Sequence, residues 1–265
     1  MSISVETYPT LAEAASAMRE GSAFLGGGTM VVRGLNFATP AYNRIIRSTD
    51  AALQEVRPEG NGVRIGAGTT MSHLMQASGV EFLGPVARSI GGPAVRNMAT
   101  AGGNLFVRAP FGDLGVAFLA LDAKVEMSDG HTLAIEDFYA QRDRLRGLVS
   151  AILVPRPAHG AFTFRKITRT KPKGAAVMAI AAHVPAGGRI SGARIAFGAM
   201  GATPLRAKDA ETALEGASLD AQSVQRACDA CCNGLDPQDD ALASAWYRRA
   251  VAPVHLRRLL LNEEA

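Results

Sequence analysis

The sequence predicts an α+β protein, and three observations support that class. A helix-capping signal near the N-terminus, at Thr10 and Glu13, precedes apolar residues at helical spacing. Short strand-like runs recur along the chain, and several of them lead directly into glycine-rich turns. After residue 160 the sequence pattern changes to two long runs of alternating apolar and polar residues, followed by alanine-rich helices. We therefore expect two parts, a mixed α+β part at 1–160 and a smaller α+β part at 161–265.

The first helix carries both a start and a stop signal. Thr10 and Glu13 have the spacing of a capping box, in which each side chain accepts a hydrogen bond from a backbone N–H at the helix start. Gly21 stands where a C-cap glycine is expected. Together these signals place a helix between Thr10 and Gly21.

Strands are indicated where apolar and polar residues alternate, or where a brief apolar run lies between turns. They are expected at 23–25, from Ile45, at 63–65, 123–127, 132–135, 148–154 and 161–167, and in the longer runs 175–184 and 189–197. Further helices are expected at 71–75, 80–90 and 113–121. A cluster of proline and glycine at 155–160 marks the junction between the two parts.

Two glycine-rich turns each contain a Gly-Gly pair and end in a polar residue. The first, Gly26-Gly27-Gly28-Thr29, follows a strand, and the second runs from Thr100 to Asn104. Successive N–H groups in such a turn can bind phosphate oxygens, and glycine lets a ligand approach the backbone. Taken alone, three glycines after a strand more often form only a tight turn. The two together predict loops that converge on one elongated, phosphate-containing ligand.

A Rossmann dinucleotide-binding fold is the obvious alternative for the first turn. Gly26 and Gly28 supply the first two glycines of the fingerprint, and Asp50 lies where the ribose-binding acid is expected. However, Val31 occupies the position of the third glycine. No convincing amphipathic helix leads to the next strand, and no βαβ series follows. The Rossmann fold is therefore rejected.

Composition and charge exclude other classes. The chain has 265 residues and a formal net charge of +4, with 48% hydrophobic and 20% charged residues, the profile of a globular protein. Basic clusters at 142–146, 165–173 and 248–258 lack the interleaved aromatics of a nucleic-acid surface. The N-terminus does not resemble a signal peptide, and no apolar stretch could span a bilayer. We expect a cytoplasmic protein.

Several longer stretches resemble one family, the FAD-binding medium subunits of the molybdenum hydroxylases, which include carbon monoxide dehydrogenase and xanthine dehydrogenase. The resemblance covers essentially the whole chain, with its motifs in the family's order. The stretches are FLGGGTMVV (24–32), VRIGAGTTMSHL (63–74), IGGPAVRNMATAGGNLF (90–106), GDLGVAFLALDA (112–123), ARIAFGAMGATPLRAKDAETALEG (193–216) and WYRR (246–249).

The resemblance implies the PCMH-type FAD-binding fold, with two α+β subdomains at about 1–55 and 56–160 and a smaller α+β flavoprotein domain at 161–265. It implies non-covalent FAD, since the first glycine loop has no histidine to which a flavin could be attached. Its implied contacts are, in the first loop, Leu25, Gly26, Gly27, Gly28, Thr29 and Met30; in and before the second, Ile90, Thr100, Ala101, Gly102, Gly103 and Asn104; and beyond these Asp113, Val149 and either Arg165 or Lys166.

By the same resemblance, the function is electron transfer within a complex. A small subunit with two [2Fe–2S] clusters would pass electrons to the FAD, and a large molybdopterin subunit would oxidise the substrate. The FAD would then reduce NAD⁺ or another acceptor, and the assembly would be a dimer of heterotrimers. One departure is Arg108-Ala109-Pro110-Phe111, where many members have Asn-x-Ser-Pro.

Other candidate sites favour ordinary structural roles. Cys228, Cys231 and Cys232 lie within about one helical turn but lack a fourth metal ligand, so helix packing is expected and no metal. Asp113 is either the N-cap of its helix or a ligand contact. No nucleophile–histidine–acid arrangement is found, which fits a protein whose cofactor carries the chemistry. The alternative function is a stand-alone FAD-dependent reductase of the same broad fold.

Overall fold

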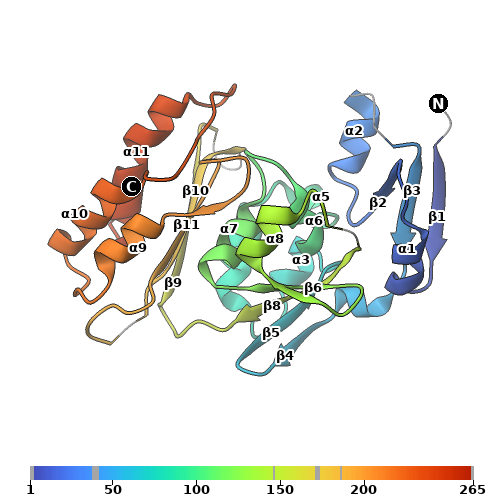
Figure 1. The fold of residues 1–265 in the computed structure, drawn as a ribbon, viewed down its shortest axis with the longest axis horizontal. Coiled ribbons are helices and arrows are strands. Elements are labelled where there is room, and N and C mark those ends of the chain that lie inside the picture. The colour runs from blue at the N-terminus through green and yellow to red at the C-terminus, as the bar shows by residue number, and fades with distance from the viewer. Residues whose placement is uncertain (1–2, 38–41, 146, 171–173, 186, 264–265) are drawn as a thin grey trace. The chain divides into compact units, whose positions relative to one another are not determined.

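The computed structural model describes residues 3–37, 42–145, 147–170, 174–185 and 187–263. The chain forms two compact units (Figure 1). The first comprises Met1–Val107 and Lys124–Val154, and the second comprises Arg108–Ala123 and Pro155–Ala265. The segment 108–123 thus lies in the second unit although it precedes residue 160. The predicted boundary at 160 stays a prediction.

The first unit begins with a three-stranded parallel sheet in the order β1-β3-β2. Its elements follow in chain order as β1 (Ser4–Tyr8), α1 (Leu11–Ala17), β2 (Ser22–Phe24), α2 (Val31–Phe37) and β3 (Arg44–Ser48). The predicted capping box is confirmed. Thr10 Oγ1 accepts from the Glu13 N–H, and the Glu13 carboxylate accepts from the Thr10 N–H, both at 3.2 Å.

Two expectations for this region are wrong. The first helix ends at Ala17 with Met18 as its C-cap, and Gly21 instead has a φ of +76° in the turn before β2. A helix, α2, does connect the first glycine turn toward β3, so a short βαβ series is present within these three strands. None of the residues of α2 or β1 is buried, which explains why neither element left an apolar pattern in the sequence.

A five-stranded sheet follows in the first unit, in the order β4-β5-β8-β6-β7. Its strands are β4 (Val56–Glu59), β5 (Gly62–Gly66), β6 (Lys124–Met127), β7 (Thr132–Ala134) and β8 (Val149–Pro155). The helical segments of this region are η1 (Ala51–Gln54), α3 (Met71–Leu74), η2 (Glu81–Leu83), α4 (Gly84–Ser89), α5 (Pro93–Arg96), α6 (Ala101–Phe106) and α8 (Ile135–Gln141). The expected strand at 132–135 therefore ends one residue early, because Ile135 begins α8.

The second unit contains a four-stranded antiparallel sheet in the order β12-β11-β10-β9. Its elements are α7 (Asp113–Ala120), β9 (Phe162–Thr168), β10 (Ala176–His183), β11 (Arg194–Gly198), β12 (Leu205–Arg206), α9 (Lys208–Leu214), α10 (Ala221–Ala230) and α11 (Ala245–Leu260). The predicted strands near 161–167 and 175–184 and the alanine-rich helices are confirmed, and so is the α+β class. Of the predicted run 189–197, only the part from Arg194 is a strand, β11.

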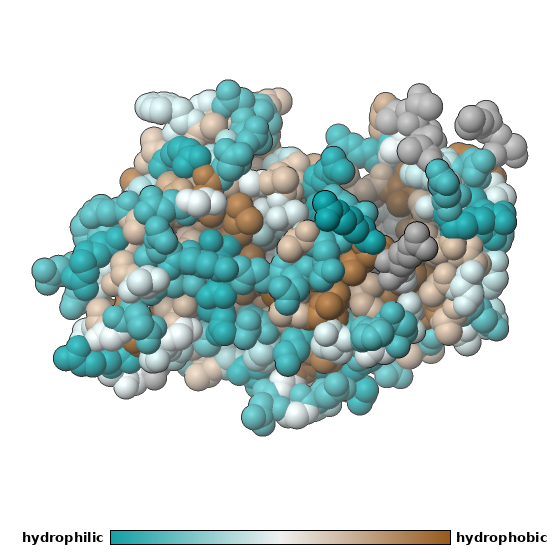
Figure 2. Space-filling model, in the orientation of Figure 1, coloured by the Kyte–Doolittle hydropathy of each residue, from teal (hydrophilic) through white to brown (hydrophobic). Residues whose placement is uncertain are grey.

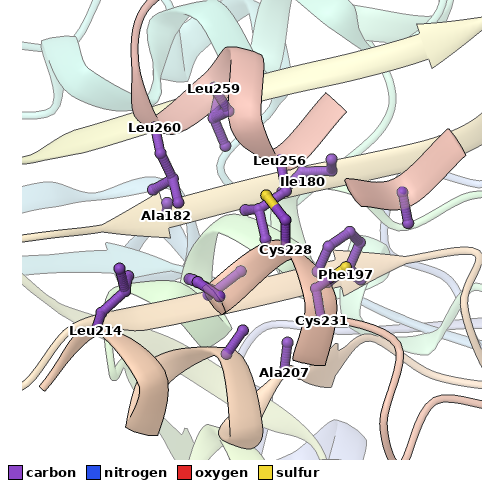
Figure 3. Close-up of a cluster of buried hydrophobic side chains, with 14 of the residues drawn as sticks. Ile180, Ala182, Phe197, Ala207, Leu214, Cys228, Cys231, Leu256, Leu259 and Leu260 are labelled. Atoms are coloured by element: carbon purple, nitrogen blue, oxygen red, sulfur yellow. The ribbon is translucent and has the colours of Figure 1, made fainter. Parts of the chain in front are cut away.

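The two faces of this sheet carry different partners. Ile180 and Phe197 face a core with α9, α10 and α11, which also buries Cys228 and Cys231 (Figure 3). Ala179 points the other way, because side chains alternate along a strand. On that side α7 contacts β10 and β11, and a Cβ on Gly198 would lie 2.6 Å from Val116 Cγ2 of α7. All eight residues of α7 are buried, as an apolar helix requires.

Candidate functional site

The first glycine segment, Leu25–Met30, is an open loop between β2 and α2. Its first N–H is bound, since Leu25 N donates to Ile46 O at 2.7 Å. The next five N–H groups, those of Gly26 to Met30, make no hydrogen bond to a described residue. The segment is partly exposed and contains a left-handed residue, Gly28, with a φ of +75°. The loop therefore holds a run of unused backbone donors at the surface.

Glycine is required in this loop because it rests on another part of the backbone. A Cβ built on Gly27 would lie 1.6 Å from Met98 O, so any side chain here would clash with the backbone. A Cβ on Gly26 would lie 3.0 Å from Thr100 Oγ1. The structure thus brings the first glycine segment against residues 98–100, which lead into the second segment and include its first residue.

The second glycine segment, Thr100–Asn104, is not a turn, and this expectation is wrong. Thr100 is the N-cap of α6, so the glycines lie in the first turn of a helix. The N–H groups of Ala101 to Asn104 are already used. Ala101 N donates to Thr69 O at 2.9 Å, Gly102 N to Ala67 O at 2.8 Å and Gly103 N to Thr100 Oγ1 at 3.1 Å. This segment can therefore contact a ligand by close packing, but it has no run of free backbone donors to bind one.

A third glycine-containing segment, 66–70, holds the second one in place. It supplies the acceptor carbonyls of Ala67 and Thr69, and Thr70 forms a β-bridge with Thr100. A Cβ on Gly102 would lie 2.7 Å from the Cβ of Ala67, so this glycine is needed for packing. Gly103, in contrast, is exposed. Ala67 and Thr69 are absent from the predicted contacts, although the GAGTT pattern is the signal that identifies them.

Exposed apolar side chains flank the two segments. Among the described residues of the first unit, all the large exposed hydrophobic side chains except Val5 lie near them in sequence. They are Met30, Val32, Phe37, Val95, Met98 and Phe106. Figure 2 shows hydrophilic residues over most of the face it draws, with smaller hydrophobic areas between them. Polar donors next to exposed apolar surface suit a ligand that has both a charged and an aromatic part.

Two further predicted contacts of the first unit have buried side chains. Ile90 is the C-cap of α4 and is 9% exposed, while Val149 begins β8 and is 5% exposed. The residue after Val149 lies next to the third segment, since Ala67 N donates to Ser150 O at 2.9 Å. Both side chains therefore contribute to the core.

Asp113 and Lys166 form a buried ion pair in the second unit, with Lys166 Nζ 2.6 Å from Asp113 Oδ2. Burial raises the pKa of the Asp113 carboxyl above its usual value, while Lys166 acts in the opposite direction. The N-cap of α7 is Gly112, so Asp113 is the first helical residue and the N-cap interpretation is wrong.

Strand parity separates Arg165 from Lys166. Lys166 pairs with Ala179 across the sheet and lies on the face that α7 covers, whereas Arg165 pairs with Ile180 on the opposite face. There Arg165 Nη2 donates to Glu263 O at 3.0 Å. Of the two alternatives, only Lys166 is brought together with Asp113.

The three cysteines lie at the C-terminal end of α10, with Cys228 and Cys231 in the apolar core. No group of three or more metal-binding side chains occurs in the described ranges. No helix in those ranges is long and apolar enough to cross a membrane.

Comparison with known proteins decides the family. The family model for the FAD binding domain in molybdopterin dehydrogenase matches residues 2–157, and that for the CO dehydrogenase flavoprotein C-terminal domain matches residues 162–262. The chain belongs to this family. As a family member, it is an oxidoreductase subunit with FAD as its cofactor, and the predicted family and cofactor are confirmed.

Individual relatives of this flavoprotein agree over nearly its whole length. It is 28% identical to the xanthine dehydrogenase FAD-binding subunit of Escherichia coli O157:H7, covering 90% of this chain and 88% of the relative. It is 29% identical to the carbon monoxide dehydrogenase medium chain of Afipia carboxidovorans, covering 91% and 88%. The solved carbon monoxide dehydrogenase of Hydrogenophaga pseudoflava matches with a TM-score of 0.88 at 27% identity, covering 98% and 96%.

Proposed function

We propose that this flavoprotein transfers electrons within a molybdenum hydroxylase. In this proposal a small iron–sulfur subunit with two [2Fe–2S] clusters reduces its FAD, and a large molybdopterin subunit oxidises the organic substrate. Electrons would then pass to NAD⁺ or another acceptor. The relatives named as FAD-binding subunits and medium chains support this assignment.

The open first glycine segment carries the proposal. The five free N–H groups of Gly26–Met30 provide donors for the oxygens of a diphosphate. The residues present fit FAD, because the glycines leave the backbone accessible and the neighbouring apolar side chains are exposed. We assign the diphosphate of FAD to this segment. The exposed Gly103 would make van der Waals contact with the cofactor.

When bound, the FAD supplies the redox chemistry, since its ring accepts and releases electrons. The protein's own residues bind and orient it. The predicted contacts of Ile90, Asp113, Val149 and Lys166 with FAD stay predictions. Arg165 is less suited to such a contact, because it binds the backbone of Glu263.

The assembly we propose is a cytoplasmic dimer of heterotrimers. A stand-alone FAD reductase is the competing function, and it would need a proton donor and a substrate pocket on this chain. The open glycine segment does not supply either. Relatives that cover nearly the full chain and carry names of subunits favour the complex.

Purification from the native host tests the proposal. We expect the chain to co-purify with two other polypeptides, with iron and molybdenum on those partners. Acid should release one FAD per chain and leave no flavin attached covalently. Recovery of a single polypeptide that oxidises an organic substrate unaided would contradict the complex. Recovery without flavin would contradict the FAD site.

A further inference from the structure

Arg142 is buried directly after α8 and binds the backbone at the C-terminal end of α6. Its side chain is 4% exposed. Its Nη1 donates to Leu105 O at 2.7 Å and to Val107 O at 3.3 Å. The last carbonyls of a helix have no partner inside the helix, and here the guanidinium supplies one. α6 is the helix that begins with the second glycine segment.

Aromatic packing makes a second connection between the same two helices. The Arg142 guanidinium lies 5.6 Å from the centroid of the Tyr139 ring, and Tyr139 packs edge-on against Phe138. Phe138 in turn packs edge-on against Phe106 of α6, with 5.5 Å between ring centroids. α8 therefore holds the C-terminal end of α6 through both hydrogen bonds and ring contacts.

The charge of Arg142 is balanced mainly by backbone oxygens. The carboxylate recorded beside it, that of Asp143, is 3.7 Å from Nε and is itself 78% exposed. An exposed ion pair of this length contributes little. The short hydrogen bond to Leu105 O is therefore the main interaction that fixes the guanidinium, and it ties the arginine specifically to α6.

Both ends of α6 are thus fixed by other elements. The 66–70 segment binds the N–H groups of Ala101 and Gly102, and Arg142 binds the carbonyls at the other end. Six helical residues span only about 9 Å, so a displacement at one end is transmitted to the other. The exposed Gly103 lies between these two anchors.

We propose that Arg142 is a positioning residue for FAD, which sets the place of Gly103 by holding the C-terminal end of α6. This inference rests on the proposed function, since it assumes that FAD contacts the second glycine segment. Arg142 does not itself need to touch the cofactor.

Arg248 provides a matched control in the second unit. Its side chain is 1% exposed, and it binds the backbone carbonyls of Val177, Gln238 and Ala243 as well as the Asp240 carboxylate, which lies 2.8 Å from Nη2. Arg142→Gln and Arg248→Gln thus each remove a buried guanidinium from backbone acceptors. Both should lower the unfolding temperature of the flavin-free chain, but only Arg142 binds the helix that contains the second glycine segment.

The experiment measures FAD binding to the full-length flavin-free chain by fluorescence quenching, together with the visible spectrum of the bound flavin. Arg142→Gln should raise the Kd for FAD about tenfold and shift the visible bands, since hydrogen bonds from a charged donor are lost. Arg142→Lys keeps a charged donor but loses the planar guanidinium, so its Kd should rise about threefold, between wild type and Arg142→Gln. Arg248→Gln should leave the Kd within about twofold and the spectrum unchanged.

The outcomes separate the two proposals. Wild-type affinity and spectrum in Arg142→Gln, or an equal loss of affinity in Arg248→Gln, would overturn the positioning role alone. If Arg142→Gln does not fold, Arg142→Lys decides, because a Kd equal to wild type with an unchanged spectrum counts against positioning. A wild-type chain that binds no FAD would overturn the proposed function itself.

Discussion

The first and second glycine segments have similar compositions but opposite hydrogen-bonding states. In Gly26–Met30 the N–H groups make no hydrogen bond within the described part of the chain, and the glycines are needed because the loop lies against residues 98–100. In Thr100–Asn104 the N–H groups are already bound by the cap and by residues 67 and 69. Glycine permits close packing in both segments, but only in the first does it also leave backbone N–H groups open to a ligand. A glycine pattern in sequence does not distinguish these two uses.

Gly27→Ala should have the largest effect. Its Cβ would lie 1.6 Å from Met98 O, so the loop must move away from residues 98–100. We expect a loss of about 3 kcal/mol in unfolding free energy and loss of FAD from the purified protein. Urea unfolding and flavin absorbance measure the two. Gly84→Ala is the control, since nothing lies within 4 Å of its Cβ, and a loss of FAD there would argue against a local effect.

Gly102→Ala and Gly103→Ala sharpen the contrast within the second segment. The Gly102 Cβ would meet Ala67 at 2.7 Å, so this variant should lose about 1–2 kcal/mol of stability before any ligand is considered. The Gly103 Cβ would meet Thr100 Oγ1 at 2.8 Å, so the cap must shift, but alanine favours a helix, and the loss of flavin-free stability should be smaller than that of Gly102→Ala.

Gly103→Ala should nevertheless bind FAD about tenfold more weakly, because its methyl group occupies exposed backbone surface proposed for the cofactor. Thermal unfolding of the flavin-free chains and titration with FAD measure both quantities. Unchanged FAD affinity in Gly103→Ala would remove the second segment from the site.

The sequence predicted the elements whose signals are local. The capping box of Thr10 and the apolar helix α7 are examples, because caps and apolar runs are read over a few residues. The helical structure of the second glycine segment could not be predicted from the sequence, because two glycines disfavour a helix. Tertiary hydrogen bonds to Ala67 and Thr69 stabilise this helix instead. The choice between Arg165 and Lys166 depended on strand register, which requires knowledge of the pairing partner.

A pair of N-cap substitutions has a smaller expected effect. Thr10 and Thr100 each accept a hydrogen bond from the third residue of a helix. Thr10→Val and Thr100→Val should each cost about 1 kcal/mol of unfolding free energy. Only Thr100→Val should also weaken FAD binding, because it loosens Gly103. Equal FAD affinity in the two variants, measured by titration, would show that the cap does not matter to the site.

Acid should produce the smallest effect. Hydrogen bonds from Arg64 and, to a smaller extent, from Ser150 hold the pKa of Glu126 below its usual 4.5. The backbone carbonyl of Ser150 also accepts from the N–H of Ala67, whose own carbonyl binds Gly102 of the second segment. A lowered pKa contributes stability above pH 4.5 that is lost as the pH falls through the folded value. Glu126→Gln should therefore cost up to about 1 kcal/mol near neutral pH and less near pH 3 in urea unfolding. An equal cost at both would contradict this linkage.

Helix α7 has a consequence for how the polypeptide is made. It is encoded between two stretches of the first unit, yet it packs against β10 and β11 of the second. A ribosome therefore releases this helix, which is apolar apart from Asp113, before any strand of its sheet has been synthesised. A fragment that starts after residue 160 would lack the helix and leave the Ala179 face of the sheet uncovered. Truncation at the most obvious point in the sequence should thus yield an aggregation-prone product, whereas a fusion that reattaches 108–123 to the fragment should restore the missing layer.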